Sequence, residues 1–167
     1  MSLNLEQSSS LTAVFAVASA GAALTGLSGG ATTYSSSAFG FALNGDHYAK
    51  GSVSGGTTPT TDGNSGAAMT LTANQAAAFV WAVDSSGTVK VYKGATVSWT
   101  DTTANSTACP LPSIPGTVTP FAAHTVQAGS TTSGTWTFGS SNWNATGISS
   151  ITVRNLCQLR NQPLLTT

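Results

Sequence analysis

The sequence predicts an all-β fold, an antiparallel β-sandwich or small barrel preceded by an N-terminal arm or short helix. Apolar and polar residues alternate with a period of two through most of the chain after residue 30, as in strands that bury one face. Turn residues interrupt these runs about every 8 to 12 residues, the spacing of sandwiches and barrels. Four Trp and six Phe, most of them in the alternating runs, favour a packed core over a disordered Ser/Thr-rich chain.

Residues 1–30 are expected to form an apolar arm, and residues 31–167 a β domain with a C-terminal tail. The stretch "LTAVFAVASAGAAL" at residues 11–24 is shorter than the roughly 20 apolar residues that cross a bilayer. It fits a helix or an extended arm, and "GLSGG" at residues 26–30 then acts as a flexible joint. The residues expected to contact a neighbouring chain are Leu11, Val14, Phe15 and Val17.

The first β-hairpin is expected within "SAFGFALNGDHYAKG". Phe39, Phe41 and Leu43 share one face, and the chain reverses at Asn44-Gly45, a pair that favours the positive φ angles of a type I′ turn. This turn sets the register, so Phe41 is expected opposite Tyr48 as an aromatic cross-strand pair.

A second hairpin is expected within "AAAFVWAVDSSGTVKVYKG", residues 76–94. One of its faces carries Phe79, Trp81 and Val83, and Val89 and Val91 return beside them. The turn is Asp84-Ser85-Ser86-Gly87. An aspartate at the start of such a turn accepts hydrogen bonds from nearby backbone amides, so Asp84 is interpreted as a turn former.

Further strands and loops follow from composition. Strands are expected at residues 68–73, 95–99, 118–126, 134–138 and 148–153, and loops at residues 54–66, 100–116 and 139–147. Seven to nine short strands result, as in a sandwich or small barrel. Trp81, Trp99 and Trp136 fall within strands and are assigned to the core.

Neither histidine lies in a recognisable catalytic motif. His47 and His124 fall inside expected strands without a neighbouring nucleophile pattern, so no catalytic residue is assigned. Asp62 and Asn64 have a calcium-like spacing but lack the rest of an EF-hand loop, and the segment is interpreted as a turn.

The two cysteines also lack a recognisable metal motif. Cys109 and Cys157 are far apart and show no CxxC pattern, so no metal or cofactor is expected. Whether these two form a disulfide stays open; free thiols are favoured for a chain made in a reducing cytoplasm.

The charge and polarity of the chain limit the classes of partner that it can bind. Charged residues make up 6% of the chain and the formal net charge is zero, against about 25% charged residues in ordinary soluble domains. Without a basic patch, nucleic-acid binding is not expected, and no membrane span is expected. A neutral surface favours association. Trp143, in the polar loop "SNWNATG", is expected to be exposed, as an interface anchor or a sugar-stacking surface.

The order of several segments resembles a group of tailed-bacteriophage virion proteins, small β-rich chains that dress the capsid exterior. The likeness covers about residues 32 to 160, and its most specific parts are "FVWAVDSSGTVKV", the Pro-x-x-Pro link at Pro112 and Pro115, and "TWTFGSSNW". Such proteins are described as structural, as head decoration (cement) or as head fibre. The resemblance implies a virion role without catalytic residues.

Together these observations give one expected function. The chain is expected to be a non-enzymatic protein of the capsid exterior, made in the host cytoplasm, with the major capsid protein and copies of itself as partners. A trimer is expected first and a dimer second. The alternatives are a tail or fibre component, a carbohydrate-binding or receptor-binding module that uses Trp143, and a secreted adhesin-like β domain whose mature chain begins near Ala20.

Overall fold

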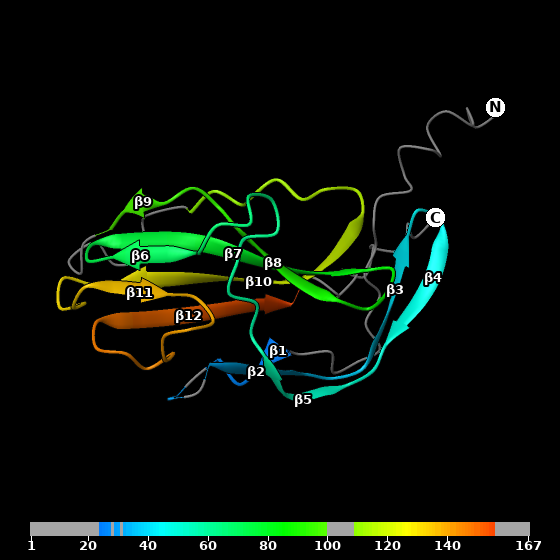
Figure 1. Cartoon of the computed structure of the whole chain (residues 1–167), viewed down its shortest axis with the longest axis horizontal. Coiled ribbons are helices and arrows are strands. Elements are labelled where there is room, and N and C mark those ends of the chain that lie inside the picture. Colours follow the sequence, from blue (N-terminus) through cyan, green and yellow to red (C-terminus); the bar gives the residue numbers. More distant parts are fainter. Residues whose placement is uncertain (1–23, 28, 31, 100–108, 156–167) are drawn as a thin grey trace, which may run out of the picture.

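The computed structural model describes residues 24–27, 29–30, 32–99 and 109–155, with side chains as far as Ile148. These residues form an antiparallel all-β sandwich without a helix (Figure 1). The strands are β1 (Leu24–Thr25), β2 (Thr33–Ser36), β3 (Phe39–Leu43), β4 (Asp46–Lys50), β5 (Val53–Thr57), β6 (Thr70–Thr72), β7 (Gln75–Asp84), β8 (Val89–Lys93), β9 (Val97–Ser98), β10 (Val118–Ala128), β11 (Thr135–Thr137) and β12 (Ile148–Asn155). The described residues contain no helix long and apolar enough to span a membrane.

The main sheet is built on two long central strands, β7 and β10. Its order is β12-β10-β7-β8, and β9 also pairs with β7. The β7–β10 register shifts between Pro120 and Ala122, because proline has no N–H to donate and central strands tolerate it only at a bulge. The predicted hairpin of residues 76–94 is confirmed, with Trp81 opposite Val91.

A second layer comes from one long bent hairpin, residues 33–57. Its strands β2 and β5 pair with each other, and β3 and β4 continue the same antiparallel pairing to the turn at Asn44-Gly45. Both turn residues have positive φ, 54° and 89°. Phe41 lies opposite Tyr48 with ring centroids 5.3 Å apart, as predicted. Figure 1 shows β3 and β4 standing across one end of the main sheet.

Both faces of β7 are covered, which explains its eight consecutive buried residues from Ala76 to Val83. Phe79, Trp81 and Val83 belong to the large core, which also receives residues from the bent hairpin and the β6–β11 pair. On the other face, Ala82 packs with Tyr92, Val118 and the half-buried Ile114. A strand buried on both faces loses the strict alternation of a half-buried strand.

Two expectations about the N-terminal half were wrong. The segment of residues 54–66 was expected to be a loop, yet it contains most of β5. The arm was expected to end at residue 30, yet β1 pairs with β2, and Leu24 and Leu27 are buried in the large core. The β domain therefore begins before residue 31, because burial of these two leucines stabilises the pairing of β1.

Candidate functional site

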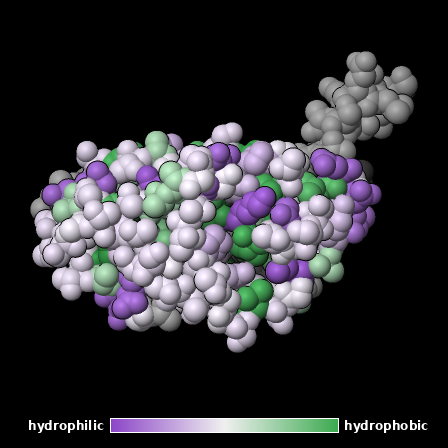
Figure 2. Space-filling model, in the orientation of Figure 1, coloured by the Kyte–Doolittle hydropathy of each residue, from purple (hydrophilic) through white to green (hydrophobic). Residues whose placement is uncertain are grey.

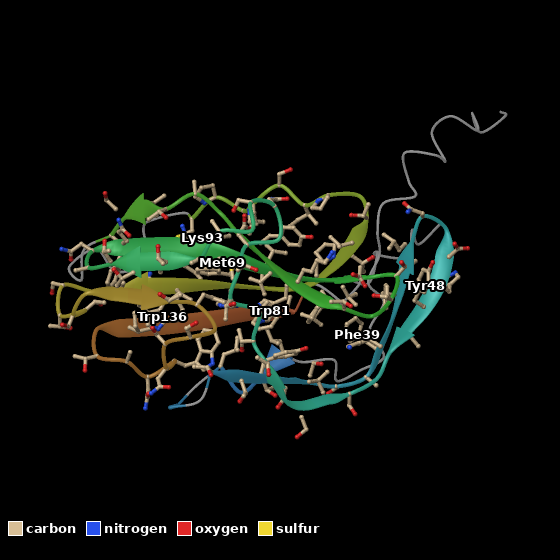
Figure 3. All side chains as sticks on the ribbon, in the orientation of Figure 1. Phe39, Tyr48, Met69, Trp81, Lys93 and Trp136 are labelled. Atoms are coloured by element: carbon tan, nitrogen blue, oxygen red, sulfur yellow. The ribbon has the colours of Figure 1, made fainter. Side chains whose placement is uncertain are left out.

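Six aromatic rings gather between the main sheet and the layer that covers it. They are Phe79, Trp81, His124, Trp136, Phe138 and Trp143. Phe79 and Phe138 stack with centroids 4.5 Å apart, and Phe138 meets Trp143 edge-on at 5.2 Å. Figure 3 shows Trp81 in the middle of the molecule and Trp136 beside β11. We call this set the aromatic cluster.

His124 is the only ionisable member of the aromatic cluster. Its Nδ1 accepts a hydrogen bond of 3.0 Å from the indole Nε1–H of Trp81. The ring is therefore the neutral tautomer with its proton on Nε2. Complete burial lowers the pKa of His124 from 6.5 to about 3, because an apolar surrounding disfavours the charged imidazole.

The contacts of His124 are those of a core residue. Its Nε2 has no hydrogen-bond partner among the described residues, and an unmet buried donor costs about 1–3 kcal/mol. The neighbouring rings of Phe79, Phe138 and Trp143 carry no group that titrates as an acid or a base. His124 lies in β10 and His47 in β4, which confirms the strand assignment of both.

Trp143 is buried, so the expectation of an exposed indole was wrong. It is 3% exposed, and its Nε1 donates a long hydrogen bond of 3.4 Å to the carbonyl oxygen of Thr33. Its loop, residues 139–147, is tied down further by a 2.9 Å bond from the Asn144 N–H to the Gly29 carbonyl. An interface or sugar-stacking role that depended on an exposed Trp143 therefore loses its basis.

Two aspartates are held inside turns. Asp84 accepts hydrogen bonds at Oδ1 from the Ser86 and Thr88 amides, at 3.0 and 2.9 Å, which confirms its role as a turn former. Burial acts to raise the pKa of this carboxyl, but the hydrogen bonds, led by that of the Ser86 hydroxyl, keep the pKa below its usual value. A carboxylate stabilised in this way serves the turn rather than a reaction.

Asp62 closes the outer edge of β8. Its Oδ1 accepts the Lys93 amide at 2.9 Å, its Oδ2 accepts the Ser65 amide at 2.9 Å, and the Gly63 amide donates to the Val91 carbonyl at 2.8 Å. Burial again opposes the shift, but hydrogen bonds from Lys93 and Ser65 lower the pKa of Asp62. The turn interpretation of this segment is confirmed.

The lysines are also engaged within the chain. Lys50 Nζ donates to the Gly87 carbonyl at 2.7 Å, and Lys93 Nζ donates to the Thr96 hydroxyl. Lys90 lies 3.6 Å from Asp84. Among the aspartates and lysines whose side chains are described, only Asp46 forms no side-chain hydrogen bond or ion pair; each of the others binds a group of its own fold.

The Pro-rich link presents an apolar side chain that the sequence analysis did not single out. Leu111 is 66% exposed and is the one large hydrophobic residue exposed to this degree in the described part of the chain. The link is fixed beside it, because Ser113 accepts a 2.9 Å bond from Asn64 and Ile114 packs on the smaller core. The sequence signal was its position between Pro110 and Pro112, which have a fixed φ and no N–H and so keep this link out of a sheet interior.

The remaining candidate residues are few. Cys109 is a half-buried free thiol, and burial raises its pKa. Leu11, Val14, Phe15, Val17 and Cys157 lie outside the described residues. The described residues contain no group of three or more His, Cys, Asp or Glu side chains arranged to hold a metal ion.

Comparison with known proteins gives no relative. No protein-family model matches the chain, and neither the curated proteins nor the solved structures contain a match.

Proposed function

We propose that the chain is a non-enzymatic structural protein of a phage virion that decorates and stabilises the capsid exterior. Its partners under this proposal are the major capsid protein and further copies of the chain, with a trimer as the first expected assembly and a dimer as the second. The resemblance of residues 32 to 160 to virion proteins suggests this class, and the surface of the β domain supports it.

The observation that carries the proposal is how few charged side chains the surface offers to a partner. Charged residues make up only 6% of the chain, and Lys50, Asp62, Asp84 and Lys93 bind groups of their own fold, so few charges remain for a partner. Figure 2 shows one face of the molecule as mostly pale, between the hydrophilic and hydrophobic extremes. Association of such surfaces removes few charges from water, so little desolvation free energy opposes contact.

A decoration protein also needs a rigid surface whose sheet edges do not pair at random. The segment around Asp62 covers the edge of β8, and an edge covered in this way does not recruit a foreign strand. Leu111 is held on a fixed link, so its burial in a partner would cost little conformational entropy.

The proposal is tested by binding to empty shells assembled from the capsid protein encoded in the same genome. Purified full-length chain is sedimented with the shells, beside Leu111→Ser and a deletion of residues 1–22, which leaves Leu24 and Leu27 in the core. Thr117→Ser, also exposed, is the matched control. We expect saturable binding of the full-length chain and the control, and at least about tenfold weaker binding for Leu111→Ser, as for an interface anchor.

Failure of the full-length chain to bind the shells at any concentration would contradict the proposed function. Unchanged binding of Leu111→Ser would remove Leu111 from the contact surface, and unchanged binding of the deletion would remove the arm residues.

A further inference from the structure

The burial of His124 has a consequence in acid. The ring lies on β10, where the register places it opposite Phe79 of β7 and Val153 of β12. It stacks on Phe79 and on Phe138, both with centroids 5.6 Å away. The side chain of His124 is 3% exposed, so water has almost no access to the imidazole while these rings stay in place.

Among the described residues, no carboxylate contributes to the pKa of His124, which burial alone lowers. Tyr34 packs on Trp81 at 4.9 Å, and Lys93, opposite Phe79 on β8, directs its Nζ to Thr96. On β12 the register places Arg154 opposite Ala123. Tyr34 is a phenol and Lys93 is a cation, and neither favours a further positive charge on His124.

Protonation also conflicts with the hydrogen bond that orients the ring. The lone pair of Nδ1 accepts the Trp81 Nε1–H, and a proton on Nδ1 would place two donors against each other. The cation would gain some attraction from the faces of the stacked rings. It would still lose the Trp81 bond and remain without a partner for Nε2, which already lacks one among the described residues.

We propose that His124 is an acid-sensitive latch: uptake of one proton at Nδ1 breaks the bond from Trp81 and releases the loop of residues 139–147 from the main sheet. The proton comes from solvent, the imidazole becomes an imidazolium cation, and no covalent bond of the protein breaks. The opened form holds the proton because water then solvates the charge.

The loop of residues 139–147 is the part that opens most readily. It forms no strand pairing, and Trp143 meets the imidazole edge-on at 6.2 Å. Trp143 and Asn144 donate to the carbonyl oxygens of Thr33 and Gly29. Two further bonds join the loop to β11, from the Trp136 Nε1–H to the Asn142 carbonyl oxygen and from the Thr137 N–H to the Ser141 hydroxyl. Breaking these contacts disturbs far less structure than separating β7 from β10, which share a ladder along nearly their full length.

The pH range follows from the two protonation equilibria. Burial lowers the pKa of His124 from 6.5 to about 3, so the open form binds protons more tightly than the closed form. The closed form is fully favoured above pH 6.5, and its advantage falls about tenfold for each pH unit from there towards pH 3. Acid thus exposes Trp143 and the aromatic surface beneath it.

The test is an acid titration of the full chain, followed by tryptophan fluorescence and by binding of a dye specific for exposed apolar surface. Wild type is compared with His124→Gln, whose amide keeps an acceptor for Trp81 but takes up no proton. His47→Gln removes the exposed histidine of β4 and is the matched control. We expect a reversible transition in wild type and in His47→Gln, displaced by about one pH unit or more towards acid in His124→Gln.

Two further measurements keep the latch testable if His124→Gln folds poorly. Trp81→Phe keeps a ring but removes the Nε1–H, so the equilibrium between closed and open forms should change less between pH 7 and 4 than in wild type. In wild type, the NMR signal of the His124 ring should not titrate until the fluorescence transition begins. A His124 signal that titrates near pH 6.5 in the closed protein, or coincident transitions in wild type and His124→Gln, would overturn the proposal.

Discussion

Replacing Trp143 with alanine removes an indole that the structure places in the core of the sandwich. The side chain is 3% exposed and meets Phe138 at 5.2 Å and Trp136 at 5.8 Å. Burial of about 250 Å² at about 25 cal/mol/Å² gives an upper limit of about 6 kcal/mol. The bond to Thr33 is 3.4 Å long and adds little. Measured Trp→Ala changes in cores cost about 3–5 kcal/mol, so we expect Trp143→Ala to lower the free energy of unfolding by about 4 kcal/mol.

The assay is urea unfolding followed by circular dichroism. With a slope of about 2 kcal/mol per molar urea, the midpoint should fall by about 2 M. Leu111→Ala is the control, because a side chain that is 66% exposed should change the free energy of unfolding by no more than about 0.5 kcal/mol. A Trp143→Ala midpoint within about 0.5 M of wild type would refute the core assignment and restore Trp143 as a surface contact.

Three other predictions test the packing and the turns. Gly94→Ala should lower the unfolding temperature by several degrees, because its Cβ would overlap the Pro110 carbonyl oxygen. Gly116→Ala is the control and should leave the unfolding temperature unchanged, because a Cβ there meets no atom within 4 Å. Equal unfolding temperatures of the two variants by calorimetry would contradict this prediction. Asp84→Ala should cost about 1–2 kcal/mol in urea unfolding, because two turn amides lose their acceptor; unchanged hydrogen exchange of the Ser86 amide would count against it. The hydrogen bonds also keep the pKa of Asp84 in the folded protein below its usual value of 3.8. The stabilisation by the ionised Asp84 is therefore present above pH 3.8 and is lost as the pH falls through the lower pKa of the folded protein. Asp84→Asn should therefore flatten the pH dependence of stability below about pH 4, and an unaltered acid limb would exclude this contribution.

The hairpins could be predicted because their signals are local. Asn44-Gly45 favours a tight turn, which fixes the register that places Phe41 opposite Tyr48. The Asp84 turn has the same character, since its carboxylate binds amides two and four residues further on. Such features depend on neighbours in the sequence and need no knowledge of the rest of the fold.

The strands of the covering layer could not be predicted in this way. The sequence of β5, "VSGGT", has the composition of a loop, yet it pairs with β2. Gly56 favours this pairing, because a Cβ there would lie 2.5 Å from Cγ1 of Val53 and 3.2 Å from the ring of Tyr34. The place of Leu24 in the domain could not be predicted either, because its burial depends on a core assembled from distant segments.

The candidate site was only partly visible in the sequence. The strand position of His124 could be predicted, but its bond to Trp81 joins residues 43 positions apart and arises only when β7 and β10 pair. The loop composition around Trp143 indicated exposure, whereas the aromatic cluster buries the indole. The polarity of neighbouring residues does not predict whether one side chain of a polar loop is buried in the core.

The central claim, that this chain is a building block of a capsid exterior, is tested most directly by cryo-electron microscopy of shells incubated with the purified full-length protein. The account predicts additional density for a β-sandwich at symmetry-equivalent positions on the outer surface, with the Leu111 link at a contact. Shells without added density at saturating protein, together with a chain that remains a monomer in solution, would contradict it.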